Sequence, residues 1–291
     1  MPGIKELKTR IKSIQSTRKI TRAMQMVSAA KMRKAQNAAL SSRTYSDMAW
    51  GLIHSLAQKT YLDNPLLHTF PDATKTGTII ISTNKGYVGG FNTNLANKLK
   101  ETEEASQNAK AELFVMGRKI KEFAVRFNKN LAADFPKTDT LATVESIYPL
   151  AKLVSDLYKT GEYKFISIVY NKFVSTINQK PTVKQLLPFS QSYIKDSHFV
   201  HTKDVQTEYL FEPDPHIVLD RLLPRIIESQ IYQAILESDA SEHSARMVTM
   251  KNATEAADDL ISDYTLTYNQ LRQNKITTEL AEITAGRIAL E

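Results

Sequence analysis

The stretch ARMVTMKNATEAADDL, residues 245–260, is the part of the sequence on which the fold depends most. Its composition favours a helix, but its apolar residues are typical of a buried helix face and its charged residues of a solvated one. A second stretch, MQMVSAAKMRKAQ at residues 24–36, also combines methionine with small residues, and all its charges are positive. Both patterns indicate helices that have partners on more than one side. Periodicity alone leaves open which side chain faces which neighbour.

Proline and glycine divide the chain into three parts. Residues 4–64 contain no proline and one glycine, and the same is true of the chain after residue 224. Because these residues interrupt helices, their absence predicts one helix over residues 2–59 and another that begins near Asp214-Pro215. At 1.5 Å per residue the two helices would be roughly 85 and 100 Å long. An isolated domain needs no such helices, so we expect them to pair with each other.

The N-terminal segment also has the spacing of a coiled-coil seam. Apolar residues recur every three or four positions in a narrow stripe, which continues after a phase slip. The stripe begins with Ile4, Leu7, Ile11 and Ile14.

Charge is distributed unevenly along the chain, whose net charge is +7. Residues 7–46 include ten basic residues and no acid, whereas residues 237–263 include seven acids and two basic residues. A basic segment is typical of proteins that bind nucleic acid, an anionic membrane surface or an acidic protein. The first aromatic residue is Tyr45, so most of this segment offers nothing for base stacking. Pairing of the two helices would explain part of the asymmetry.

The middle of the chain, about residues 76–190, alternates between strand-like and helical patterns. The strand-like runs are TGTIIIST, AELFVMG, FISIVYNKF and PTVKQLLPF, and helical runs such as RKIKEFAVRF and ESIYPLAKLVSDLYKTGE lie between them. This alternation predicts a small, mainly parallel, Rossmann-like α/β domain. The predicted fold is therefore α/β, with two long paired helices (1–60 and 214–291) and an α/β domain (61–213). Residues 191–211 have no clear period and are interpreted as an irregular connection.

No segment carries a recognisable catalytic constellation. The turn NKGYVGGFN at residues 84–92 follows a strand, as phosphate loops do, but it matches neither GxGxxG nor GxxxxGK[ST]. A tight strand-to-helix turn explains its glycines better. His198 and His201 have HxxH spacing in a polar loop, but a metal site would need further ligands. The absence of cysteine excludes disulfides, thiolate metal sites and cysteine nucleophiles, and we expect no cofactor.

Length and composition are those of a soluble protein with one large or two ordinary domains. The chain has 291 residues, of which 42% are hydrophobic and 24% charged. No window approaches the roughly 18 apolar residues of a membrane-spanning helix. The N-terminus lacks the apolar core of a secretory signal, so we expect the protein to stay in the compartment where it is made.

Several segments, in order along the whole chain, resemble the gamma-subunit family of F-type ATP synthases. They are STRKITRAMQMVSAAKMRKAQ near the N-terminus, then STNKGYVGGFN, YLFEPDP, ESQIYQAILESDASEHSARMVTMKNATEAADDLI and RQNKITTELAEITAG. The turn departs slightly, since the family more often has Asp-Arg-Gly-Leu-Cys-Gly there. The chain also lacks the cysteine-bearing insertion of the chloroplast form, so thiol regulation of that kind is not expected.

The resemblance implies that the paired terminal helices (1–60 and 214–291) form an antiparallel coiled coil. This coiled coil would be a non-catalytic rotor shaft inside a ring of alternating alpha and beta subunits. The α/β domain would stand on the ring of c subunits beside the epsilon subunit, at the cytoplasmic face of the bacterial inner membrane. Contact with the membrane would be indirect, through the c ring. Proton flow would turn the ring, and the shaft would carry this rotation to the nucleotide sites of the beta subunits.

The resemblance also suggests which residues meet partners. Contacts with the catalytic head are expected from Met24, Lys31, Arg33, Lys34, Arg246, Arg272 and Gln273. The candidate foot on the c ring comprises Arg43, Thr44, Tyr45 and Glu212. Two other classes of protein stay open from the residues alone. One is a helical nucleic-acid-binding protein that uses the basic segment. The other is an α/β enzyme with long assembly helices, which would have a polar pocket at the strand ends.

Overall fold

The computed structural model describes residues 3–59, 64–105, 110–189 and 214–288. The chain divides into two compact units. The first comprises Met1–Ala29 with Arg246–Glu291, and the second comprises Ala30–Ala245. We call them the helical unit and the α/β unit.

Two long helices contribute to both units. Helix α1 spans Ile4–Lys59 and helix α6 spans Pro215–Ile288, which confirms the two long helices predicted from the scarcity of proline and glycine. Pro215 takes the first helical position, where the missing N–H costs no hydrogen bond. Pro224 lies inside α6, so the helix begins at the earlier of the two prolines.

In the helical unit, α1 and α6 pair as an antiparallel coiled coil. Arg18 lies 2.5 Å from Asp258, and the Thr21 and Thr254 hydroxyls lie 2.8 Å apart. Residue numbers rise along α1 while those of their partners fall along α6, so the helices run in opposite directions. Leu7 is buried on α1, and the buried or half-buried residues of α6 recur every three or four positions. These α6 residues are Met250, Thr254, Ala257, Ile261, Tyr264, Tyr268 and Leu271.

This pairing shows which residues of the stretch 245–260 face α1, a question that periodicity alone left open. Met250, Thr254 and Ala257 are buried in the seam, whereas Lys251 and Asn252 are exposed. The stretch therefore combines methionine, small and charged residues because one side of the helix is buried in the coiled-coil seam and the other side is exposed.

The α/β unit contains a five-stranded sheet in the order β3-β2-β1-β4-β5. Four strands run parallel to one another: β1 (Lys75–Ile81), β2 (Lys110–Met116), β3 (Leu131–Phe135) and β4 (Tyr163–Phe173). The fifth, β5 (Gln179–Leu187), runs antiparallel to β4. The mainly parallel α/β architecture is confirmed. The short edge strand β3 was not predicted, since its sequence LAADF lacks a β-branched residue.

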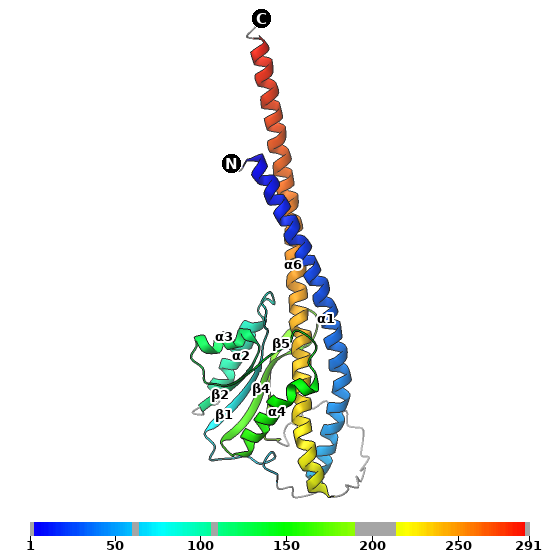
Figure 1. Cartoon of the computed structure of the whole chain (residues 1–291), viewed down its shortest axis with the longest axis vertical. Coiled ribbons are helices and arrows are strands. Elements are labelled where there is room, and N and C mark those ends of the chain that lie inside the picture. The colour runs from blue at the N-terminus through cyan, green and yellow to red at the C-terminus, as the bar shows by residue number, and fades with distance from the viewer. Residues whose placement is uncertain (1–2, 60–63, 106–109, 190–213, 289–291) are drawn as a thin grey trace. The chain divides into compact units, whose positions relative to one another are not determined.

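Helices cover both faces of this sheet (Figure 1). On one face α2 (Phe91–Ala105) and α3 (Arg118–Arg126) pack against Ile80 and Val115. On the other face α4 (Val144–Lys159) and the first half of α6 pack against Ile79 and Ile81. Successive residues of a strand point to opposite faces, which explains why neighbouring isoleucines serve different cores.

The first half of α6 therefore belongs to the hydrophobic core of the α/β unit. Ile226, Ile231 and Ile235 are buried in the same cluster as the sheet residues. The predicted domain boundaries, after residue 60 and before residue 214, lie at segments outside the described residues (60–63 and 190–213) and stay a prediction. The expected irregular connection at 191–211 lies there too.

Candidate functional site

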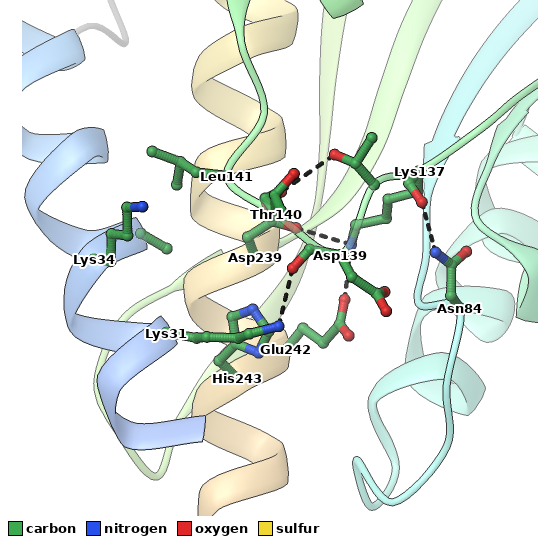
Figure 2. Close-up of a pocket in the computed structure, with 12 residues that line it drawn as sticks. Lys31, Lys34, Asn84, Lys137, Asp139, Thr140, Leu141, Asp239, Glu242 and His243 are labelled. Carbon is green, nitrogen blue, oxygen red and sulfur yellow. Dashed lines mark hydrogen bonds and ion pairs between the residues drawn. The ribbon is translucent and has the colours of Figure 1, made fainter. Parts of the chain in front are cut away.

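A polar pocket of about 200 Å³ lies in the α/β unit, beyond the carboxyl ends of β1 and β3 (Figure 2). In sheets of this kind ligands bind where the strand order reverses, and here the order reverses at β1. The pocket is lined by side chains from α1, from the turn after β1, from the loop after β3 and from α6. They include Lys31, Lys34, Asn84, Lys137, Asp139, Asp239, Glu242 and His243.

Lys137 forms the buried centre of this pocket. Its Nζ lies 2.8 Å from Glu242 and 3.0 Å from Asp239, both on α6, and it donates a hydrogen bond of 2.9 Å to the carbonyl oxygen of Ser82. Only 6% of the Lys137 side chain is exposed. Burial by itself would lower the pKa of Lys137, but the two carboxylates outweigh burial and raise it above its usual range. Lys137 is therefore a fixed positive charge, and it is unsuited to act as a neutral amine base or nucleophile.

The loop after β3 is held by three further contacts. Asn84 donates a hydrogen bond of 2.6 Å to the carbonyl oxygen of Lys137, and Lys31 donates one of 3.0 Å to the carbonyl oxygen of Asp139. Lys85 lies 2.5 Å from the Asp139 carboxylate, and this hydrogen bond holds the pKa of Asp139 below its usual range. The charged groups around the pocket thus bind one another, and this arrangement joins elements of the fold.

The NKGYVGGFN segment forms the tight strand-to-helix turn that its glycines predict. Tyr87 and Gly89 adopt left-handed conformations with φ of 61° and 56°. Asn92 donates a hydrogen bond of 2.9 Å to the Thr83 hydroxyl, which closes the turn. Val88, within the turn, packs in a small cluster with Ala245 of α6.

Three of the predicted partner residues lie together on α1 in the α/β unit. Lys31, Arg33 and Lys34 are exposed, while Met32 and Ala35 between and beside them are buried. We call these three residues the basic cluster. Lys31 and Lys34 also line the pocket, whereas Arg33 does not.

The other predicted contacts lie in the helical unit and differ in exposure. Met24 is half-buried and Arg246 is only 8% exposed, whereas Arg272 and Gln273 are exposed. Leu271 is the last half-buried residue of α6, and every residue from 272 to 288 is exposed.

The exposed end of α6 carries apolar residues on one side. Ile276, Leu280 and Ile283 are 43%, 59% and 70% exposed, at the i, i+4 and i+7 spacing of a single helix face. We call these three residues the apolar stripe. Within the described parts of the chain, no segment covers this stripe.

The candidate foot is only partly described by the structure. Arg43, Thr44 and Tyr45 belong to α1, but their side chains lie outside the described part of the chain, as does Glu212. His198 and His201 are outside it too. Among the described residues no group of three or more histidines and acids is placed to hold a metal ion, and no helix is long and apolar enough to cross a membrane.

The sequence did not predict that Lys137, Asp239 and Glu242 meet. Lys137 stands in the polar segment FPKTDT, which is typical of a solvated loop. The only local signal was the pair of acids three residues apart in ESDASEH, on a helix that otherwise buries small residues. Nothing in the sequence indicated that a lysine about one hundred residues earlier would pair with them.

Comparison with known proteins shows the family. The family model described as ATP synthase matches residues 3–290. Proteins named ATP synthase gamma chain are similar over the whole of both chains, with 41% identity in Haemophilus influenzae (strain PittGG) and 40% in Pelotomaculum thermopropionicum.

Solved structures of low sequence identity share the fold. A chain from the Euglena gracilis mitochondrial ATP synthase, solved with OSCP, F1 and the c-ring, has 19% identity and a TM-score of 0.66, covering 99% of this chain and 94% of that one. A chain from the Tetrahymena thermophila mitochondrial ATP synthase, solved as central stalk and c-ring, has 22% identity and a TM-score of 0.60, covering 80% and 99%. This chain belongs to the family of ATP synthase gamma chains.

Proposed function

We propose that the helical unit is the rotor shaft inside a catalytic head of alpha and beta subunits. The α/β unit connects this shaft to the c ring and the epsilon subunit. Proton-driven rotation of the c ring then reaches the nucleotide sites of the beta subunits through α1 and α6. The chain contributes contacts and stiffness to this process and no catalytic group.

The uncovered end of α6 is the observation that carries the proposal. Residues 272–288 are all exposed, and a helix of this length is marginally stable when nothing packs against it. The apolar stripe gives it a face to bury, and the flanking Arg272 and Gln273 give it polar groups at the edge of that face. A surrounding collar of subunits would bury the stripe and stabilise the helix.

The basic cluster supplies the second kind of contact. Its three basic residues are exposed on α1, and Met32 between them is buried. An acidic segment of a beta subunit would be attracted to this surface, and the attraction would weaken with salt. Met24 and Arg246 stay candidate contacts of the head, and Arg43, Thr44, Tyr45 and Glu212 stay the candidate foot on the c ring.

A shaft made of two different helices presents a different surface in each direction. Each beta subunit around it meets a different surface at any moment. A contact shifts a site's conformational equilibrium only if its free energy differs between the open and closed forms. Rotation of an asymmetric shaft changes that difference at each site in turn, which couples rotation to the nucleotide sites.

The relatives support the proposed assembly and location. The Tetrahymena chain belongs to a central stalk solved with its c-ring, and the Euglena chain to an assembly of OSCP, F1 and c-ring. The similar gamma chains at about 40% identity come from bacteria. We therefore propose a peripheral position at the cytoplasmic face of the bacterial inner membrane, with membrane contact made through the c ring.

The proposal is tested by replacing the apolar stripe with serine in the full chain. The chain is co-purified with alpha, beta and epsilon subunits and is also reconstituted in vesicles as part of the complete complex, with the c ring and its membrane partners. We expect the wild-type chain to co-purify with the head and to support proton pumping driven by ATP. The stripe variant should lose much of this coupling while the isolated chain keeps its stability, because these side chains are already exposed.

A matched control replaces Val174 and Ile177 with serine. These two side chains are 54% and 84% exposed in the α/β unit. This variant loses a similar apolar surface elsewhere, and it should pump normally. A wild-type chain that fails to join the head, or that instead binds nucleic acid with steep salt dependence, would contradict the proposed function.

A further inference from the structure

The loop after β3 joins more elements than a connecting loop requires. Lys137 in this loop binds two acids of α6 and the carbonyl oxygen of Ser82 at the end of β1. The next residues bind α1 through Lys31 and the turn after β1 through Lys85. Figure 2 shows the side chains of Lys31, Lys137, Asp239 and Glu242 converging beside the loop after β3.

The same part of α6 binds the β4–β5 hairpin through hydroxyl groups. Ser241 donates a hydrogen bond of 2.9 Å to the carbonyl oxygen of Asn171, and Ser244 donates one of 2.7 Å to that of Thr176. Both hydroxyls therefore join α6 directly to backbone carbonyl oxygens of this hairpin.

These contacts are polar although they lie in the interior. Asp239, Ser241, Glu242 and Ser244 are all buried, and Lys137 is almost fully covered. Burying an ion pair is a poor way to gain stability, since apolar side chains of similar volume would serve as well or better. Polar partners do fix position, because a hydrogen bond is lost when a helix slides or turns, whereas apolar contact is non-directional.

We propose that the segment of α6 from Asp239 to Ser244 is the fastening through which torque passes between the sheet and α6, with Lys137 as its central positioning residue. This inference rests on the proposed function. Torque applied to the α/β unit reaches α6 through contacts that must resist sliding. Lys137, Ser241 and Ser244 hold α6 to three parts of the α/β unit: the end of β1, the loop after β3 and the β4–β5 hairpin.

The test uses the assembled, reconstituted complex with three substitutions in this chain: Lys137→Met, Asp239→Asn and Glu242→Gln. Together they remove all three charges and keep similar volumes, so no unpaired buried charge is left. We expect the complex to hydrolyse ATP at the normal rate. Its proton pumping per ATP hydrolysed, measured against an opposing proton gradient, should fall by about fivefold or more, the lower end of ordinary coupling effects.

Lys121→Met is the matched control, because it removes an exposed ion pair of 2.5 Å between α3 and β3 and contacts none of the residues of the fastening. It should pump as the wild type does. If the triple variant does not assemble, the pair Ser241→Ala and Ser244→Ala decides the question, since it removes two hydroxyls and no charge. The proposal is overturned if a variant complex contains the chain and pumps as many protons per ATP hydrolysed as the wild type does against the same gradient. Failure of the proposed function is distinguishable, because the wild-type complex itself would then not pump.

Discussion

The Thr21–Thr254 pair gives the sharpest test of how the two long helices meet. The two hydroxyls lie 2.8 Å apart in the buried seam, and each also contacts a carbonyl of its own helix. Thr21→Val removes the hydrogen bond between helices, but Thr254 can still donate to the Met250 carbonyl oxygen at 2.8 Å. Neither single substitution leaves an unpaired buried donor.

The expected magnitudes follow from these partners. Losing the interhelical bond costs about 0.5–1.5 kcal/mol, and the extra buried methyl group returns about 0.8 kcal/mol. Each single valine variant should therefore be destabilised by less than about 1 kcal/mol. The bond is lost only once, so the double variant should be more stable than the sum of the singles predicts, by about 0.5–1.5 kcal/mol.

Native-state hydrogen exchange of the full chain measures this coupling, because it reports opening of the helical unit separately from the α/β unit. Thr265 is the control, since it is exposed and its hydroxyl donates to the carbonyl oxygen of Ile261 on its own helix. The pair Thr21→Val and Thr265→Val should be additive. Additive effects for Thr21 and Thr254 would mean that the helices do not pair in this register, and the antiparallel seam would be refuted.

Three further predictions concern the α/β unit and its surface. Gly117→Ala should lower the unfolding free energy of the α/β unit, measured with denaturant, by more than about 2 kcal/mol. The reason is that φ is 104° at Gly117 and a Cβ would lie 2.6 Å from the Ser82 carbonyl oxygen. The Asp139 carboxyl should titrate below its usual pKa, so its contribution to stability is lost as pH falls below about 4. Lys85→Met should raise this pKa towards the usual value, and an unchanged NMR titration would contradict the contact. Reversing the basic cluster to glutamate should weaken coupling between ATP hydrolysis and proton pumping, and unchanged pumping in reconstituted complexes would exclude this contact.

The long helices could be predicted because their signal is local. The scarcity of proline and glycine at the two ends of the chain indicated how far these helices extend, and Asp214-Pro215 marked the start of α6. The buried strands were predicted for the same reason, since runs such as TIIIS combine β-branched residues with full burial. Edge strand β3 was missed because LAADF has neither property.

The polar fastening could not be predicted, because it depends on tertiary contacts. Lys137 and Glu242 are separated by 105 residues, and each stands in a segment that looks solvated when considered alone. Helical periodicity places Asp239 and Glu242 near each other on α6 but does not reveal what they face. The partner contacts could be predicted only through the family resemblance, since exposed residues such as Arg272 have no partner that the chain's own sequence could reveal.

Rotation of this chain inside the catalytic head tests the central claim most directly. The chain contains no cysteine, so a single cysteine at the exposed position Lys164 can carry a probe while the head is immobilised. We expect the probe to turn in one direction when ATP is added and to stop when ATP is removed. A head that contains the chain and hydrolyses ATP while the probe stays fixed would contradict the central claim.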